Sequence, residues 1–240
     1  MNFYLKTAFF IITTLCIVSY ADDIESYIHN VPYANHNIDT FYKAKRALYW
    51  IYKDHPITFY CGCTYYKYNY RKYKPVLDSC GYEIRHNERR AQRIEAEHIV
   101  PAYILGKDLP CWKIGGRRYC RQRSKEFRTR ENDLHNLVPA IGEINEDRSN
   151  YTYAVIPGEK RDYGSCNVEI DTEHHTIEPK PSIRGDIARI YLYMVDKYHL
   201  KIPQSQMTLY HRWDKKDPMD LWEYIRSIKI DAIYNDHNLK

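Results

Sequence analysis

The amino-acid sequence predicts an α+β fold in which a small pair of strands is embedded in a mainly helical single domain. Apolar residues recur at helical spacing near the start of the chain and over its last third. Between these stretches lie two short, strand-like apolar runs that carry polar side chains, and a helical pattern follows the second. The 240 residues show no internal repeat and no flexible linker, which favours one domain.

Composition indicates a soluble, mildly basic globular protein. Hydrophobic residues make up 44% of the chain, and 36 Lys and Arg against 31 Asp and Glu give a formal net charge of +5 at pH 7. This mixture is too apolar for intrinsic disorder and too polar for a multi-span membrane protein. Tyrosine is unusually frequent, with 25 residues that each combine a stacking face with a hydroxyl group.

Residues 1–21 have the pattern of a secretory signal peptide. Lys6 precedes an uncharged, mostly apolar run over 7–18, and Ser19 and Ala21 are the small residues expected before a cleavage point. The run is shorter than the ~20 apolar residues that a spanning helix prefers. We therefore expect a mature domain at 22–240, in the periplasm or the medium and without a membrane partner; an uncleaved N-terminal anchor is the alternative.

The first elements of the mature chain are predicted over 38–75. Apolar residues recur at helical spacing over 38–51, with Lys and Arg between them, and this predicts an amphipathic helix that Pro56 terminates. The β-branched and aromatic residues at 57–60 predict a strand. Over 60–75, six tyrosines are interleaved with Lys and Arg. That ribbon fits either a surface that stacks bases and neutralises phosphates or an exposed strand kept soluble by its lysines.

Six cysteines follow the signal peptide and predict three disulfides formed in an oxidising compartment. Six cysteines allow 15 pairings, and the sequence selects none, although Cys111–Cys120 is favoured as a local bridge. Zinc is the competing use, but there is no C-x-x-C pair and the Cys-Gly-Cys spacing is wrong for a common zinc knuckle. The cysteines are Cys61, Cys63, Cys80, Cys111, Cys120 and Cys166.

Two segments carry side chains that bind metals or transfer protons, at 95–102 (Glu-Ala-Glu-His-Ile-Val-Pro-Ala) and 133–150 (beginning Asp-Leu-His-Asn-Leu-Val-Pro-Ala). They predict a strand with Glu97 and His98, a long loop, a strand with Asn136, and a helix whose first turn contains Pro139. Neighbouring strand residues point to opposite faces, so Glu97 and His98 can serve one reaction only at a twist or strand end. One carboxylate and one Asn carbonyl suffice for magnesium, which keeps several waters.

The predicted loop between these segments is strongly basic. Residues 112–130 contain eight Lys or Arg and a single acid, Glu126. Such concentrated charge is typical of a site for a polyphosphate ligand, and a solvated surface loop is the alternative. The predicted nucleic-acid contacts within it are Lys113, Arg118, Arg121 and Arg123.

The last part of the chain is predicted to be mostly helical. Loops and short strands are expected over 150–182, followed by three helices with apolar residues at 187–195, 207–213 and 218–230. Apolar stripes of this kind are nearly always core, so we assign these helices to packing rather than to chemistry.

At these positions the sequence resembles the bacterial endonuclease I family, whose members are secreted or periplasmic non-specific nucleases with a ββα-metal (His-Me finger) core. The resemblance runs from the helix near Ala44 to about Trp222. It departs from the family pattern at Ala96, at Glu146 and in the tail after Trp222. The matching motifs are Phe59-Tyr60-Cys61-Gly62-Cys63, Glu97-His98-Ile99-Val100-Pro101-Ala102, Gly115-Gly116-Arg117, Asp133-Leu134-His135-Asn136-Leu137, Asp147-Arg148-Ser149-Asn150 and Arg184-Gly185-Asp186-Ile187-Ala188-Arg189.

The resemblance implies a role for each of four residues. Glu97 and Asn136 would hold one divalent cation, usually Mg²⁺, with Ca²⁺ or Mn²⁺ as substitutes. His98 would be the general base that activates a water, and Arg117 would stabilise charge on the scissile phosphate. Supporting roles would fall to Asp133, His135, Asp147 and Arg148.

We therefore expect a secreted, magnesium-dependent endonuclease that hydrolyses the phosphodiester bonds of DNA with little sequence preference and acts as a monomer, with RNA as an open second substrate. No helix-turn-helix or zinc finger is evident, and contacts to phosphate carry no base information. The alternatives are a ribonuclease that prefers RNA on the same site and a secreted nucleic-acid-binding protein without catalysis.

Overall fold

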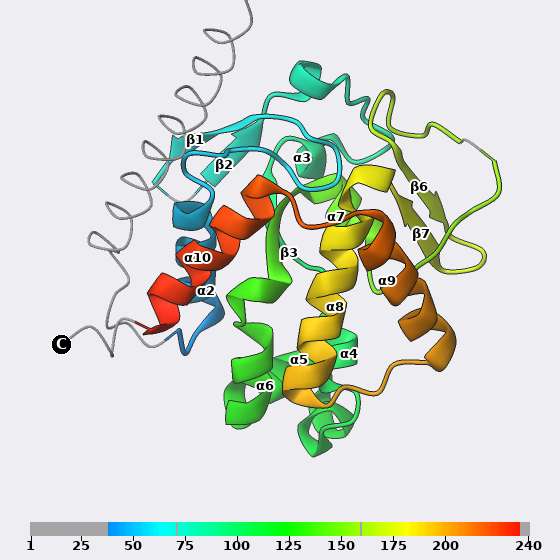
Figure 1. Ribbon diagram of the computed structural model, residues 1–240. Helices are drawn as coiled ribbons and strands as arrows, with labels where there is room; N and C mark the ends of the chain where they lie inside the picture. The colour runs from blue at the N-terminus through cyan, green and yellow to red at the C-terminus, as the bar shows by residue number, and fades with distance from the viewer. Residues whose placement is uncertain (1–37, 71, 159, 236–240) are drawn as a thin grey trace, which may run out of the picture. The chain divides into compact units, whose positions relative to one another are not determined.

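The computed structural model describes residues 38–70, 72–158 and 160–235, so the predicted signal peptide lies outside the described part of the chain (Figure 1). The described residues belong to two compact units, Ile38–Asp220 and a second unit that includes the helix α10 (Leu221–Asn235). Within the described ranges, no helix is both long and apolar enough to cross a membrane.

The centre of the larger unit is a strand pair followed directly by a helix. Strand β3 (Ile94–His98) pairs antiparallel with β4 (Leu137–Ile141), with Glu97 opposite Val138, and α7 (Gly142–Arg148) begins at the next residue. All five residues of β4 are buried. The predicted order of two strands and a helix is confirmed, and it gives the α+β architecture.

The position of Pro139 differs from the prediction, because this residue lies in β4 and not in the first turn of α7. It stands opposite Ala96, and its carbonyl accepts the backbone N–H of Phe59 at 2.8 Å, on the side away from β3. At such a non-hydrogen-bonded position the nitrogen also points away from the partner strand. The missing N–H of Pro139 therefore costs no hydrogen bond between β3 and β4, and the strand tolerates proline at this position.

The basic connection between β3 and β4 is helical, so the prediction of a long loop was wrong. Gly116 has a φ of +58° and divides α5 at a kink, and Ser124 caps α6 by accepting the backbone N–H of Phe127 at 3.1 Å. Neither half of α5 is long enough to display an apolar stripe, so its sequence gave no helical period. The elements are α4 (Ala102–Gly106), α5 (Pro110–Arg123), α6 (Lys125–Glu131) and the 3₁₀ turn η2 (Leu134–Asn136).

The N-terminal helix is confirmed as α2 (Phe41–Ile51), which Thr40 caps at Lys43. The strand predicted at 57–60 is wrong: only an isolated bridge joins Ile57 to Thr64. The chain turns there because two closely spaced cysteines bond to different partners, with Gly62 between them at a φ of +77°. The tyrosine-rich ribbon forms the hairpin β1 (Tyr65–Asn69) and β2 (Lys72–Pro75), and Arg71 lies outside the described residues.

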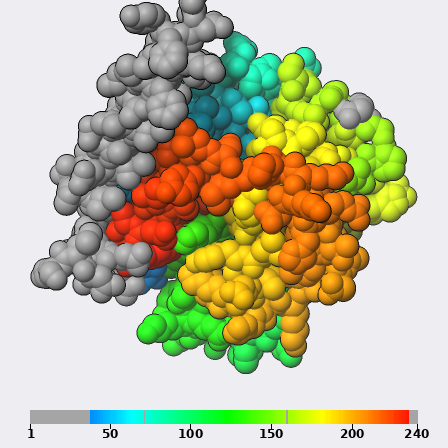
Figure 2. Space-filling view, viewed as in Figure 1, coloured from blue at the N-terminus to red at the C-terminus, as the bar shows by residue number. Residues whose placement is uncertain are grey.

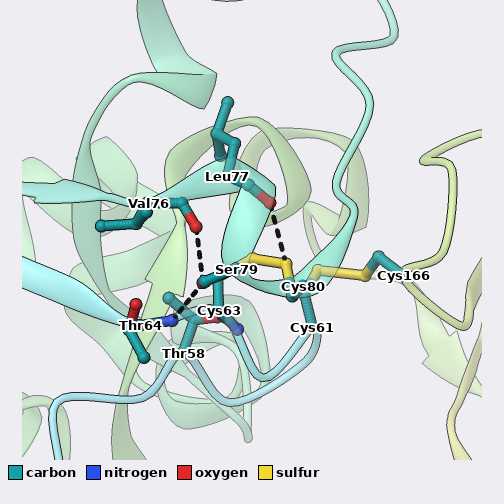
Figure 3. Close-up of a disulfide and its surroundings, with 9 residues drawn as sticks. All are labelled: Thr58, Cys61, Cys63, Thr64, Val76, Leu77, Ser79, Cys80 and Cys166. Atoms are coloured by element: carbon teal, nitrogen blue, oxygen red, sulfur yellow. Dashed lines mark hydrogen bonds between the residues drawn. A yellow bond between two sulfur atoms is a disulfide. The ribbon is translucent and has the colours of Figure 1, made fainter.

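Three disulfides join all six cysteines, as predicted: Cys61–Cys166, Cys63–Cys80 and Cys111–Cys120. The bridge from Cys61 spans 105 residues and ties the turn after α2 to the segment before β6, whereas the favoured local bridge spans 9. Near the first two bridges, the Ser79 hydroxyl donates to Val76 O and accepts the N–H of Thr64 at 2.6 and 2.9 Å (Figure 3). Long closed loops reduce the entropy of the unfolded chain, so these bridges stabilise the fold.

The remainder of the larger unit follows the predicted pattern of short strands and then helices. A three-stranded sheet has the order β5-β7-β6, and α8 buries the stripe Ile187, Ile190, Tyr191 and Met194. Figure 2 shows α8 and α9, in yellow and orange, packed side by side, in agreement with their extensive contacts. The elements are η1 (Leu77–Cys80), α3 (Glu88–Ala91), β5 (Thr152–Tyr153), β6 (Val168–Asp171), β7 (Thr176–Pro179), η3 (Pro181–Ile183), α8 (Arg184–Tyr198) and α9 (Gln204–Lys216).

Candidate active site

Glu97, next to the end of β3, has a buried carboxylate with three partners. One oxygen, Oε1, accepts the Tyr60 hydroxyl at 3.1 Å and lies 3.2 Å from Nη1 of Arg148. The other, Oε2, accepts the backbone N–H of His98 at 3.0 Å. Burial raises the pKa of Glu97, while the Arg148 guanidinium and the Tyr60 hydroxyl oppose that rise. The negative charge of Glu97 is therefore balanced by one buried group, the guanidinium of Arg148.

Arg148, the last residue of α7, connects that helix to the end of β3. Its Nη1 donates to the carbonyl of His98 at 2.9 Å, and its Nη2 donates to the carbonyl of Ile99. Its guanidinium also lies 5.0 Å from the ring centre of Tyr153, whose hydroxyl is hydrogen-bonded to Tyr60. One side chain thus contacts both the carboxylate of Glu97 and the backbone that carries His98.

His98 has a different set of partners from its neighbour Glu97. Its Nε2 lies 2.8 Å from the carbonyl of Glu131, and its ring stacks on Phe41 at 5.1 Å between centres. A carbonyl can only accept, so Nε2 carries the proton and Nδ1 is left with a free lone pair. Burial, and then the charge of Arg117, lower the pKa of His98 to about 4. The imidazole is therefore neutral at pH 7 and can accept a proton.

Arg117 lies on the same side as His98, together with Arg121. Both donate through Nε to the buried carboxylate of Glu131, at 2.6 and 2.7 Å, and both guanidinium groups lie over the ring of Phe41, at 5.7 and 5.0 Å. Their side chains remain 41% and 40% exposed. Because both bonds use Nε, the terminal nitrogens of the two forks remain available for phosphate oxygens.

Sequence reasoning missed Glu131 and Phe41. Glu131 is the first residue after the basic run at 112–130, and Phe41 belongs to the apolar stripe of α2. Arg117 and Arg121 could have indicated such an acid, because arginines four residues apart share one helix face and can bind one anion.

Comparison with known proteins identifies the family of this chain. The sequence profile of the Endonuclease I family matches residues 16–239. The chain belongs to the endonuclease I family. It is 43% identical over 203 residues to an extracellular deoxyribonuclease of Aeromonas hydrophila, covering 84% of this chain and 87% of that protein. It is 41% identical over 210 residues to a periplasmic deoxyribonuclease of the same species, covering 87% and 88%.

A third relative is Endonuclease-1 of Buchnera aphidicola subsp. Acyrthosiphon pisum, 44% identical over 201 residues that cover 84% of this chain and 80% of that protein. These relatives confirm the resemblance seen in the motifs. The chain is thus a nuclease of the periplasm or the extracellular medium, and its three disulfides suit that location.

Asn136 occupies a backbone clamp in this endonuclease. Its Oδ1 accepts the N–H of Val100 at 2.7 Å, and its Nδ2 donates to the carbonyl of Val100 at 2.9 Å. The amide thereby holds the chain that leaves β3 against the chain that enters β4. A cation would have to bind the same Oδ1 that accepts the N–H of Val100. The role of Asn136 as a metal ligand therefore stays a prediction.

Another amide lies on α7, which packs against β3. Asn145 donates its Nδ2 to Glu95 at 2.7 Å, and within the described residues its Oδ1 accepts no hydrogen bond. Glu95 and Glu97 are two positions apart on β3 and share one face of the strand. Sequence reasoning gave Asn145 no role, because only the packing of α7 brings it to this face.

The donors around Glu97 fit a hard cation that retains most of its waters. Carboxylate and amide oxygens are the groups on this face, and oxygen ligands are those that Mg²⁺ prefers. In the described part of the chain, no three His, Cys, Asp or Glu side chains gather closely enough to hold an ion by themselves. A site here would therefore rest on one carboxylate, an amide oxygen and water.

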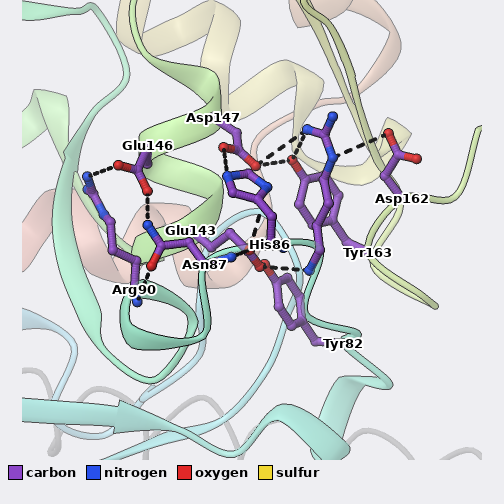
Figure 4. Close-up of polar contacts among 10 residues, drawn as sticks. Tyr82, His86, Asn87, Arg90, Glu143, Glu146, Asp147, Asp162 and Tyr163 are labelled. Carbon is purple, nitrogen blue, oxygen red and sulfur yellow. Dashed lines mark hydrogen bonds and ion pairs between the residues drawn. The ribbon is translucent and has the colours of Figure 1, made fainter.

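A second polar cluster anchors α7 at Glu143 in its first turn and at Asp147 in its last (Figure 4). The buried carboxylate of Glu143 accepts the Tyr82 hydroxyl at 2.7 Å and the backbone N–H groups of His86 and Asn87 at 2.8 and 2.5 Å. Burial opposes its ionisation, but these bonds prevail and lower the pKa of Glu143. Asp147 accepts the Tyr163 hydroxyl at 2.6 Å. Both ends of α7 are thus anchored, which sets where Asn145 and Arg148 lie.

The other predicted support, Asp133, contacts His135 directly. His135 Nδ1 and Lys197 Nζ are 3.0 and 2.9 Å from its carboxylate. Burial opposes ionisation, but these two bonds outweigh it and hold the pKa of Asp133 well below its usual range. Three of the predicted nucleic-acid contacts, Lys113, Arg118 and Arg123, are exposed on α5. The fourth, Arg121, binds Glu131 together with Arg117.

Proposed function

We propose that this endonuclease hydrolyses the phosphodiester bonds of DNA with little sequence preference, with one Mg²⁺, and acts as a monomer. The observation that carries this proposal is the state of His98: Nε2 donates to Glu131 O and leaves Nδ1 as an acceptor, and Arg117 is bound to the carboxylate of the same Glu131. The printed names of the relatives, two deoxyribonucleases and an endonuclease, support DNA as the substrate. The arrangement of β3, β4 and α7 would then be a ββα-metal core.

In this mechanism His98 Nδ1 takes a proton from the attacking water, since an imidazole with a lowered pKa is neutral at working pH. The terminal nitrogens of Arg117 bind the scissile phosphate and balance its charge. Glu97 would hold the cation together with an amide oxygen, from Asn136 as the sequence predicts or from Asn145 of α7. Once bound, the cation would stabilise the charge that develops on the leaving oxygen.

The test is plasmid nicking by the wild type and by His98→Ala, each with Mg²⁺ and with chelator, beside a labelled RNA. We expect the variant to lose roughly 10²–10⁴-fold in cleavage rate, because a general base is removed. Its DNA affinity, measured in chelator, should stay within about twofold of the wild type, because His98 is buried and Arg117 remains. Near-normal cleavage by the variant would remove His98 from the mechanism.

The same assay decides between the alternatives. Faster cleavage of RNA than of DNA would establish a ribonuclease, and no cleavage of either with Mg²⁺ would leave a binding protein. The two candidate amides are separated by Asn136→Ala and Asn145→Ala. The variant that lacks the true ligand should need a higher Mg²⁺ concentration for half-maximal activity and should bind Mg²⁺ more weakly in calorimetry. The other variant should change stability alone.

A further inference from the structure

The outer face of the β1–β2 hairpin exposes aromatic rings beside lysines, and nothing in the proposed mechanism uses it. Tyr66 and Tyr68 on β1 are 50% and 56% exposed. Register places Lys74 directly opposite Tyr66, and its Nζ lies 4.3 Å from the ring centre of Tyr68. Lys72, two residues before Lys74, is exposed on the same face. Rings and ammonium groups therefore share one side of the hairpin.

The opposite face of the hairpin is packed, so the exposed face belongs to a fixed surface. Tyr65 is buried, and Tyr73 stacks on Tyr49 of α2 with ring centres 4.0 Å apart. The Tyr49 hydroxyl also donates to the carbonyl of Ile94 at 3.3 Å, at the start of β3. The hairpin is thus fastened to α2 through the Tyr49–Tyr73 stack and also packs against β3 through β2, and its outer tyrosines are not needed to hold it.

The charge of this segment is entirely positive. No Asp or Glu occurs between Thr64 and Leu77, where the lysines are Lys67, Lys72 and Lys74. An edge strand that needed only solubility would be served by its lysines, without exposed rings on the same face. Exposed aromatic surface of this kind marks a site of interaction, and its charge fits a polyanion.

We propose that the outer face of the β1–β2 hairpin, formed by Tyr66, Tyr68, Lys72 and Lys74, binds unpaired bases of a nucleic-acid strand by stacking, with the lysines on its phosphates. The inference rests on the proposed function and extends it to the form of the substrate. Sequence-tolerant binding of single strands combines such rings with such charges, because every base has a π-face.

The spacing of the rings favours a single strand over a duplex. Residues two apart on a regular strand are roughly 6.6 Å apart along it, about twice the 3.4 Å rise per base in a DNA duplex strand. The pairing of β1 with β2 is irregular between Lys67 and Asn69, and such a bulge bends the strand at Tyr68, so the two rings are not arranged like stacked neighbouring bases. Bases inside a duplex already stack on each other and do not present a free face. Only a strand whose bases have separated can use both Tyr66 and Tyr68.

The position of the hairpin connects it to the catalytic side of the molecule. Phe41 at the start of α2 stacks on His98, and Tyr49 near the end of α2 stacks on Tyr73 of the hairpin. These two α2 residues are separated by a rise of about 12 Å at 1.5 Å per residue. A strand held on the hairpin is therefore only a few nucleotides from His98, and the hairpin would favour single-stranded or frayed substrates.

The test compares the wild type with Tyr66→Thr/Tyr68→Thr, in which threonine keeps the strand propensity but removes the rings. Affinity is measured in chelator, so that nothing is cut, by fluorescence anisotropy with DNA and RNA single strands and a DNA duplex of one sequence. We expect the double variant to lose about tenfold or more in affinity for single strands and less than about twofold for the duplex. The DNA and RNA arms show which strand the hairpin prefers.

Two controls make the result specific. Tyr66→Phe/Tyr68→Phe keeps the π-faces and should keep single-strand affinity, and Tyr224→Ala removes a tyrosine of matched exposure, 51%, and should change nothing. The double Thr variant should nick duplex plasmid at the wild-type rate, which also shows that it is folded.

Unchanged single-strand affinity in the Thr variant, or an equal loss for strand and duplex, would overturn the inference. A wild-type chain that cuts no nucleic acid would instead overturn the proposed function. The anisotropy measurement would then still decide whether the hairpin binds bases, so the two failures are distinguishable.

Discussion

The two neighbours Glu97 and His98 sit in opposite electrostatic surroundings. Around Glu97 the charges are buried: its carboxylate is balanced by Arg148, whose side chain is 1% exposed. Around His98 the pattern is reversed, because one buried carboxylate, that of Glu131, holds two arginines whose outer nitrogens remain near water. Strand alternation alone separates these environments.

The difference in burial gives the charged groups near Glu97 and those near His98 different roles. A buried pair such as Glu97 and Arg148 is expensive to break, since either partner alone is an uncompensated buried charge. It therefore fixes geometry. The half-exposed pair Arg117 and Arg121 keeps much of its hydration, so a phosphate can replace water there with little reorganisation. The phosphate should therefore dock on the arginines of the His98 side, while the buried pair fixes where the Glu97 carboxylate lies for the proposed cation.

The largest expected effect comes from breaking the buried side. Arg148→Met should lower the free energy of unfolding by about 3–5 kcal/mol, because Glu97 loses its counter-charge in a buried site and two backbone carbonyls lose their donor. Urea denaturation in chelator measures this. Arg118→Met, at an exposed position of α5, is the matched control and should stay within about 0.5 kcal/mol. A comparably small loss for Arg148→Met would show that the buried pair does not hold the strand end.

The next effect is a pH dependence on the other side. The pKa of His98 is lowered from its usual 6.5 to about 4, so the unfolded chain binds the proton more readily. Its contribution to stability is present above about pH 6.5 and is lost as pH falls towards 4, an effect of about 3 kcal/mol. Denaturation curves from pH 7.5 to 4, in chelator, should show this loss in the wild type and a correspondingly smaller loss in His98→Phe. Parallel curves for the two proteins would contradict it.

Regular burial explains which elements could be predicted from the sequence. The stripe of α2 and that of α8 were correct because burial on one helix face imposes a period. Strands β3 and β4 were correct because apolar runs fill a buried pair. The basic segment at 112–130 was misread as a loop, since its helices are short, kinked at Gly116 and stabilised by a disulfide and by the carboxylate of Glu131.

The chemistry could be predicted only in part. The motifs placed Glu97 and His98 side by side and Arg117 near them, but no pattern in the sequence shows that Glu131 offers a backbone carbonyl to the imidazole. Likewise, the clamp of Asn136 on Val100 depends on the register of β3 and β4. Such roles arise from tertiary contacts between residues 33 and 36 positions apart, and local spacing does not encode them.

A smaller effect is expected from Glu131→Gln, which removes the anion shared by Arg117 and Arg121. Both arginines are about two-fifths exposed, and solvent screening reduces the loss of stability to about 1 kcal/mol. Salt separates the two sides: raising NaCl from roughly 0.05 to 0.5 M should shrink the effect of Glu131→Gln and leave that of Arg148→Met unchanged. Equal salt sensitivity of the two variants would refute the contrast between a buried and a half-exposed side.

The smallest effect on the fold should come from the exposed basic residues of α5, in Lys113→Gln/Arg118→Gln/Arg123→Gln. These side chains are exposed and away from Glu131, so stability should stay within about 0.5 kcal/mol. Binding should still weaken, because each lost phosphate contact lowers the slope of log affinity against log salt by roughly 0.9. Arg117→Gln/Arg121→Gln, by contrast, should reduce cleavage far more than binding, because those forks lie beside His98. If the outer variant instead lost cleavage at unchanged affinity, α5 would act in the reaction itself, and docking and chemistry would share one surface.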